Sequence, residues 1–564
     1  MQALAPSISG LTKRQQYAQL MHQMKSDRSS WEKPWLDIGD YIAPYDHEFD
    51  VNDTNSGRRR DSQIINETPM QARDVGVSGL FNGLCDPTEL WLALETDNRD
   101  LNKLHRVRVW LEETRDAVLA EFAADGFYSV VPEDFGAILA FGTCASLTLE
   151  SFDGAGVMWH GACPIGSYWI SNNARRKVDQ VARELSMSAR QMQQEFPAEN
   201  LSRQVISCLK SNNHEQRFSV THIVKPNPMA RRGLMSADKA FISCYYETNC
   251  ADGDDKMLLE EGFDSNPFQV ARWKTRGNDP WGFGPGHYAI GSSKSLQAYE
   301  IDIALAREKQ INPPLIVPPG TNLAGLSLLP GALNVSLDAA GGQGLRPLHE
   351  TRFDIGAGQE AINELEGRIR DAFYNNIFLM IANDDGGKMT AREVMERARE
   401  KRLALTPILR LTNEYLTPKV ARALEIMGKR GKLPPYPPEL EGQKIRVQYK
   451  SVLAQAAMME TSANMRSHML NLVMPLAQMR PDVLDNYDLD DFLRKDAENS
   501  SVPASGLRSP EDVQAKREAD AEEQAKAIQA EKANLAANTA KTLSETNTQD
   551  QNGLTDLLAA TNPQ

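Results

Sequence analysis

Apolar residues recur every three to four positions along much of the chain, which predicts long amphipathic helices. In the first half, short apolar runs bounded by polar residues predict strands between these helices. The predicted helices cover residues 11–44, 68–86, 101–125, a run after Pro132, and 176–196. The predicted strands are WLALE, SYWISNN, SVTHIVKP, KAFISCYYET and FQVARWKT. The first 294 residues are therefore expected to form a mixed α+β body.

Two longer helices follow, with a different kind of segment between them. The first is expected over 295–311 and is stopped by Pro313 and Pro314. Residues 312–356 are punctuated by glycine and proline and predict short strands. The second helix, 357–382, repeats apolar residues at helical spacing. Two helices joined by a compact β-rich tip are the predicted arrangement.

The stretch LMIANDDGGKMTAREVM, residues 379–395, has only part of a phosphate-binding loop. That loop needs a glycine five residues before the glycine of its Gly-Lys pair, and a hydroxyl after the lysine. Ala382 and Met389 take those positions here. Thr390 and Glu393 stand instead at the spacing of a helix capping box. The residues predict an acidic loop, 383–390, between two helices. The loop begins with Asn383, Asp384, Asp385, Gly386, Gly387 and Lys388.

The rest of the chain is mainly helical. One long helix is expected from Ala391, kinked at Pro407 and Pro418, followed by a strand and turns to about residue 450. Residues 451–498 predict a helical bundle. Residues 499–564 predict a linker, an alanine- and charge-rich helix, and a disordered tail.

Composition excludes several classes of protein. The chain has 564 residues, a net charge of −14, and no run of eighteen apolar residues that would predict a membrane span. Its six cysteines and nine histidines do not fall at metal-ligand spacings, so no metal or cofactor is expected. No nucleophile motif such as GxSxG is present, which argues against a hydrolase. The acidic balance argues against tight wrapping of nucleic acid.

Several stretches, taken together and in order, resemble a known family. They are RRDSQIINETPMQA, FGAILAFGTCASLTLE, PIGSYWISNNARRKVDQVARELSMSARQMQQEF, PFQVARWKTRGNDPWGFGPG and INPPLIVPPG. The chain resembles the head-to-tail connecting proteins, the portal proteins of short-tailed bacteriophages, over roughly residues 10–480. No single motif is specific, but their joint order is.

This resemblance implies a portal fold and a ring, usually of twelve subunits, at one capsid vertex. It assigns a wing to 1–294, stem helices to 295–311 and 357–382, a clip to 312–356, and a tunnel loop to 383–390. A wing return (391–450), crown helices (451–498) and a charged helix that is a candidate barrel (within 499–564) complete the assignment. The clip would begin at Asn312, Pro313, Pro314, Leu315, Ile316 and Val317 and would dock the terminase or the tail adaptor.

The resemblance also implies the function: double-stranded DNA passes through the ring, which is assembled in the host cytoplasm and ends in the virion. The implied partners are the major capsid protein, scaffolding protein, terminase large subunit and tail adaptor or tube proteins, with no membrane and no enzymatic activity. Asp384 and Asp385 would then repel the duplex and centre it. Arg392, Arg399 and Arg402 would make weak phosphate contacts or pair with carboxylates within or between subunits.

Three alternatives stay open on the sequence. A nucleotide hydrolase would use the Gly-Lys loop, although no acidic strand end can be located as its Mg²⁺ partner. A tail adaptor or internal head protein would belong to the same virion but would differ in subunit count and pore. A cytosolic scaffold would form no ring.

Overall fold

The structure is a computed structural model of the whole chain, and it divides by packing into two units. Unit 1 comprises Met1–Leu94, Thr114–Pro435 and Arg446–Met458, and unit 2 comprises the remainder. The residues that the structure describes are 12–50, 60–98, 100–152, 156–231, 233, 235–250, 257–311, 315–316, 346–347, 355–382, 410–449, 469–480, 487–499 and 506–545.

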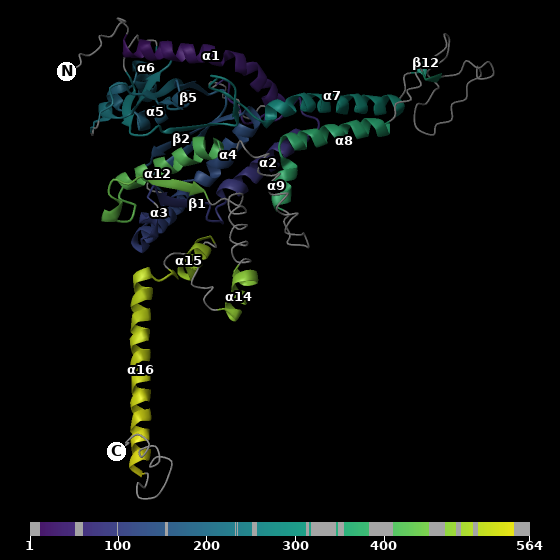
Figure 1. Cartoon of the computed structure of the whole chain (residues 1–564). Coiled ribbons are helices and arrows are strands. Elements are labelled where there is room, and N and C mark those ends of the chain that lie inside the picture. The colour runs from purple at the N-terminus through teal and green to yellow at the C-terminus, as the bar shows by residue number, and fades with distance from the viewer. Residues whose placement is uncertain are drawn as a thin grey trace. The chain divides into compact units, whose positions relative to one another are not determined.

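Two antiparallel sheets form the centre of unit 1 (Figure 1). One has the strand order β3-β2-β9 and the other the order β4-β5-β6-β7-β8. The strands of the first are β2 (Thr143–Glu150), β3 (Met158–Cys163) and β9 (Phe268–Arg272). Those of the second are β4 (Tyr168–Asn172), β5 (Val178–Ser188), β6 (Arg217–Pro226), β7 (Phe241–Glu247) and β8 (Leu259–Phe263). Three two-stranded pairs complete the strands: β1 (Leu92–Thr96) with β14 (Ile445–Tyr449), β10 (Lys274–Thr275) with β11 (Gly282–Phe283), and β12 (Leu315–Ile316) with β13 (Arg346–Pro347).

Helices surround these sheets, and several begin at the caps that the sequence provides. The helices of unit 1 are α1 (Lys13–Tyr41), α2 (Thr68–Cys85), α4 (Phe127–Phe141), α5 (Ala189–Glu195), α6 (Arg203–Lys210), α7 (Pro285–Ile311), α8 (Ile355–Ala372), α9 (Asn375–Ala382) and α12 (Thr417–Lys429). Helix α3 (His105–Ala124) has residues in both units. Thr12 and Ser188 each form a capping box with the glutamine three residues later. Gly142 ends α4 with a φ of 77°, a conformation that favours glycine.

The main core of unit 1 lies between α4, the three-stranded sheet and the helices around them. Its fully buried side chains include Trp35, Phe135, Leu147, Trp281 and Val420. Two smaller clusters lie on the five-stranded sheet, one beneath the start of α1 and one beneath α5 and α6. The fold class is therefore mixed α+β, as the sequence predicts.

Unit 2 contains short helices and one long helix. They are α14 (Met474–Met479), α15 (Leu489–Asn499) and α16 (Pro510–Glu545). Arg517 on α16 pairs with Asp490 on α15 at 2.6 Å. Trp110 and Tyr436 pack edge to face within the same unit at 5.0 Å. Among the described helices, none combines the length and the apolar character that crossing a bilayer requires.

Four predictions of secondary structure were wrong in their extent or type. The helix expected over 295–311 begins earlier, at Pro285, as α7. Residues 178–188 form strand β5 rather than a helix, and only Ala189–Glu195 is helical. The helix expected to follow Pro132 starts earlier, at Phe127, and contains Pro132, because a proline removes one hydrogen bond without having to end a helix. The helix expected over 357–382 is broken at residues 373 and 374 into α8 and α9.

Candidate functional site

Helices α7 and α8 run side by side away from the two sheets (Figure 1). Ile303 of α7 and Ile362 and Ile369 of α8 are buried. Where the chain leaves α7, β12 pairs with β13 antiparallel, Leu315 opposite Pro347 and Ile316 opposite Arg346. Of the six residues predicted to open the clip, only Leu315 and Ile316 are described. Asn312, Pro313, Pro314 and Val317 lie outside the described residues.

One asparagine connects both helices to the start of α2. The Asn66 Nδ2 group donates to Glu300 Oε1 at 2.9 Å and to Glu366 Oε1 at 3.0 Å. Gln297 Nε2 donates to the Asn66 carbonyl oxygen at 2.9 Å. These three hydrogen bonds join the helix pair to Asn66, just before α2. The sequence analysis missed them because the partners lie more than 200 residues apart.

A break separates α8 from α9, the helix that precedes the predicted acidic loop in the sequence. Tyr374 has a φ of 61°, a left-handed conformation that is unfavourable for a residue other than glycine. Its ring lies 5.9 Å from that of Trp273. Helix α9 then packs the buried Phe378 against Gly79 of α2.

Replacing Gly79 with Ala is expected to lower the free energy of unfolding by about 1–3 kcal/mol, because its Cβ would overlap the Phe378 ring. Gly291 on α7 is the matched control, since a Cβ there meets no atom within 4 Å and Gly291→Ala should stabilise by about 0.5–1 kcal/mol. The thermal unfolding temperature should fall in Gly79→Ala and rise in Gly291→Ala. Equal shifts would show that α9 does not pack on α2 as described.

The residues predicted to line a channel lie outside the described part of the chain. They are the loop residues Asn383, Asp384, Asp385, Gly386, Gly387 and Lys388, and the proposed phosphate or inter-subunit contacts Arg392, Arg399 and Arg402. The helix kink predicted at Pro407 also lies outside the described residues. The structure does place both ends of that segment: α9 ends at Ala382, and the chain is described again from Arg410.

At this second end the helix has an irregular hydrogen-bonding pattern. Residues Thr412–Leu416 form a π-helical turn, η6, and α12 follows with Pro418 as its second residue. Proline has no backbone N–H to give to the preceding turn, which favours a local departure from α-helical bonding. A π-helical turn followed by a helix with proline at its second residue recurs at η8 (Met469–Val473), where Pro475 lies in α14.

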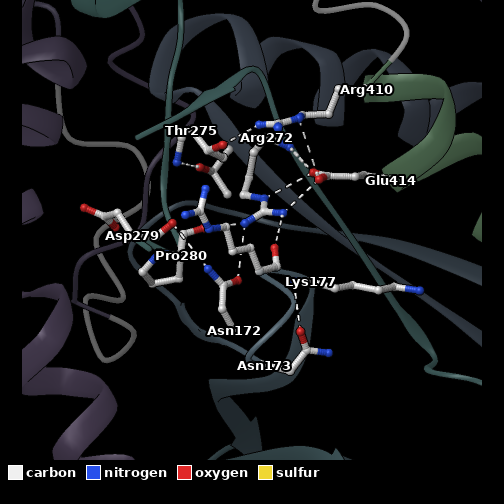
Figure 2. Close-up of polar contacts among 12 residues, drawn as sticks. Asn172, Asn173, Lys177, Arg272, Thr275, Asp279, Pro280, Arg410 and Glu414 are labelled. Atoms are coloured by element: carbon white, nitrogen blue, oxygen red, sulfur yellow. Dashed lines mark hydrogen bonds and ion pairs between the residues drawn. The ribbon is translucent and has the colours of Figure 1, made fainter. Parts of the chain in front are cut away.

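The π-helical turn is held by a first polar network, centred on Glu414 (Figure 2). The buried Arg272 donates from Nη2 to Glu414 Oε1 at 2.8 Å and from Nε to Glu414 Oε2 at 3.1 Å. The backbone N–H of Arg272 also donates to Glu414 Oε2, at 3.2 Å. Arg410 lies on the more exposed side, with its Nε 3.8 Å from Glu414 Oε1. This carboxylate therefore joins the helix to strand β9.

A second network lies at the next residue and is fully buried. The Tyr415 hydroxyl donates to Asp134 Oδ2 on α4, and Lys419 Nζ donates to Tyr415 at 2.9 Å and to Ser146 Oγ at 2.7 Å. The Lys419 and Asp134 charges are 3.8 Å apart. Burial raises the pKa of Asp134 to about 6 and lowers that of Lys419. The two networks fix the helix to α4 and to both β2 and β9.

These arrangements hold a chain segment in place and do not assemble reacting groups. In the described ranges, no group of three or more His, Cys, Asp or Glu residues could hold a metal ion. The six cysteines are free thiols, and burial raises the pKa of Cys85, Cys144 and Cys163.

Comparison with known proteins identifies the class. Residues 14–507 match the family described as bacteriophage head to tail connecting protein. The portal protein of Salmonella phage epsilon15 is 34% identical over 558 residues, covering 97% of this chain and 98% of that one. The probable portal protein of Bordetella phage BPP-1 is 32% identical over 542 residues, covering 95% of this chain and 96% of that one.

The chain therefore belongs to the bacteriophage head to tail connecting protein family. It is a phage portal protein, a structural component of the virion at the capsid vertex and not an enzyme. The resemblance found in the sequence is confirmed, and the alternatives of a nucleotide hydrolase, a tail adaptor or internal head protein, and a cytosolic scaffold are set aside. Membership also implies an oligomeric ring with contacts to capsid and DNA.

Proposed function

We propose that the chain forms a ring, usually of twelve subunits, whose central channel passes double-stranded DNA during packaging and ejection. In this proposal α7 and α8 are the stem, and the segment that holds β12 and β13 is the clip that docks first the terminase large subunit and then the tail adaptor or tube. The remaining partners would be the major capsid protein and the scaffolding protein. The observation that carries the proposal is the fixed helix pair α7 and α8, which ends in a small sheet.

The acidic loop 383–390 is proposed to face the channel. The two ends of segment 383–409, which contains this loop, support the proposal, since α9 packs on α2 and the π-helical turn is bonded to β9 and α4. Both ends of the segment are thus attached to unit 1. Asp384 and Asp385, repeated around a ring, would repel the duplex and keep it from binding to the wall.

Helix α16 supports the barrel that the sequence analysis considered. It is 36 residues long, and Ile528 and Leu535, seven residues apart, are 52% and 67% exposed. A long exposed helix with two large apolar residues two turns apart favours packing against like helices. Copies of α16 from neighbouring subunits would cover these side chains.

Electron microscopy of the purified full chain, together with its mass, tests the ring and the barrel. Rings with a central pore and a mass near twelve subunits are expected. A chain truncated after Ser509 should form the same ring without the density contributed by α16. A monomer or dimer at all concentrations, with and without scaffolding protein, would contradict the proposed ring.

Replacing both Asp384 and Asp385 with Lys tests the acidic loop. A ring of lysines would bind phosphates strongly and in a salt-dependent way, so DNA packaging should slow or stall while ring assembly is unchanged. Asn at both positions is the control, because it removes the repulsion without adding attraction. Packaging and ejection at the original rates in the Lys variant would refute a channel role for the loop.

A further inference from the structure

A cluster of cationic side chains lies on one surface of this acidic chain. It is formed by the turn between β4 and β5 and by the loop between β9 and β11. The five exposed residues are Arg175, Arg176, Lys177, Lys274 and Arg276, here called the basic surface. None of the five forms an ion pair with a carboxylate among the described residues. Lys274 lies 5.2 Å over the ring of Tyr288.

Arg272 holds the two loops of the basic surface together (Figure 2). Its Nη2 donates to the Arg176 carbonyl oxygen at 3.1 Å, and its Nη1 donates to Asn172 Oδ1 at 3.3 Å and to the Pro280 carbonyl oxygen at 3.5 Å. Asn172 Nδ2 in turn donates to the Asp279 carbonyl oxygen at 3.3 Å. Lys177 points away from these contacts (Figure 2). The two loops come from different sheets, so a buried residue joins the backbones that carry these cations.

The β4–β5 turn is itself rigid and strained. Asn173 Oδ1 accepts from the backbone N–H groups of Arg175 at 2.9 Å and Lys177 at 3.1 Å. Arg176 has a φ of 60°, where glycine or asparagine is favoured. An arginine in this conformation destabilises the fold, and its guanidinium forms no ion pair with a described residue. A strained residue of this kind indicates that the side chain serves a function.

Unpaired cations on a fixed surface suit a ligand with a regular row of negative charges. Asp279 lies beside the basic surface, in the loop between β9 and β11. Its carboxylate accepts a hydrogen bond from the Trp281 backbone N–H at 3.0 Å. Lysine and arginine contacts to phosphates give affinity without reading base sequence. Arg410, at the start of the helix that follows segment 383–409, donates to Thr275 Oγ1 at 2.6 Å. The basic surface therefore adjoins the helix that leads from the proposed channel loop.

We propose that the basic surface binds the phosphate backbone of double-stranded DNA, independently of base sequence. This inference rests on the proposed function, because the duplex is the polyanion that a DNA channel brings to the protein. With few contacts in each subunit, the interaction is weak and sensitive to salt. It lets the duplex exchange phosphates as it moves, and the acidic remainder of the chain confines the contact to this surface.

The test measures binding of a short fluorescent duplex to the full-length ring over a series of salt concentrations. The variant combines Arg175→Ala, Arg176→Gly and Lys177→Ala. Each lost phosphate contact should reduce the slope of log affinity against log salt by about 0.9, so a reduction of about 2–3 per binding subunit is expected. The loss of affinity for DNA should be equal for duplexes of different base sequence.

Two controls separate a binding role from a structural one. Arg176→Gly alone should weaken DNA binding without lowering the unfolding temperature, because glycine suits the φ of that position. Lys33→Ala, Arg203→Ala and Lys210→Ala together remove the same charge from exposed positions elsewhere on unit 1 and should leave the slope unchanged.

An unchanged affinity and slope in the first triple variant would overturn the inference, as would an equal loss in the control triple variant. Binding of polyglutamate is measured with the same variants. If the first triple variant lost polyglutamate binding but kept its full DNA binding, the inference would be overturned and the ligand would be an acidic protein. If the first triple variant still forms rings, packages DNA and binds the duplex as before, only this inference is refuted. The absence of rings would count against the proposed function instead.

Discussion

Replacing Lys419 with Met should lower the free energy of unfolding by about 3–5 kcal/mol, the usual cost of removing one partner of a buried ion pair. Lys419 is fully buried, and its Nζ is 3.8 Å from Asp134 Oδ2. Methionine fills a similar volume, so the loss is mainly that of the charge and of two hydrogen bonds. The measurement is the guanidinium concentration at the midpoint of unfolding. This midpoint should fall, while the slope of the unfolding free energy against denaturant concentration stays unchanged.

A second substitution tests whether the uncompensated aspartate is the cause. Adding Asp134→Leu to Lys419→Met removes both charges, and such replacements are often neutral or stabilising when they pack well. We expect the double variant to regain most of the lost stability, although Tyr415 then loses its acceptor. A double variant less stable than Lys419→Met alone would contradict the buried pair as described.

Local rules were enough to predict many of the elements. Thr68 and Pro69 mark the start of α2, where proline suits the first turn, and the helix ends at Cys85 before Asp86 and Pro87. The alanine- and charge-rich helix of the C-terminal region is α16. In these segments the caps, the prolines and the apolar spacing all point to one structure, so no tertiary information was needed.

Strand β5 shows where the local rules failed. Its sequence, VDQVARELSMS, has charged residues at spacings that suit an amphipathic helix. Its neighbours decide otherwise, because β5 lies in the sheet between β4 and β6 and pairs with β6 from Val181 to Ser188. Strand propensity depends on the surrounding sheet, which a single sequence does not reveal. At the break between α8 and α9, Tyr374 likewise contacts Trp273, a residue far away in the sequence.

The two networks at the π-helical turn could be anticipated only in part. Asp134 lies in the apolar run VVPEDFGAILAF, and a charge within such a run indicates a buried polar contact. Its partners, Tyr415 and Lys419, are about 280 residues away, so the pairing itself needed the structure. Arg272 lies within the predicted strand FQVARWKT and gave a similar indication, whereas Glu414, in LTNEYLTP, occurs in ordinary polar surroundings and gave none.

Glu414 is the residue through which the helix after the proposed channel loop is joined to β9. It accepts three hydrogen bonds from Arg272, two from the guanidinium and one from the backbone. The Arg272 side chain is only 4% exposed, whereas that of Arg410, which shares the carboxylate, is 38% exposed. The same carboxylate thus takes part in a buried ion pair and a solvent-exposed one, which allows the two to be compared directly.

Glu414→Gln should destabilise the chain by about 3–5 kcal/mol, because it leaves the buried Arg272 guanidinium without its carboxylate. Arg410→Ala removes the exposed partner of the same carboxylate, and screening by solvent should limit its effect to about 0–1 kcal/mol. Denaturation midpoints of the two variants measure this contrast. Since Glu414 lies directly after segment 383–409, Glu414→Gln should also speed proteolysis around residue 410 under native conditions, whereas Arg410→Ala should not. Equal effects of the two variants would mean that Glu414 holds the helix no more firmly than an exposed ion pair does.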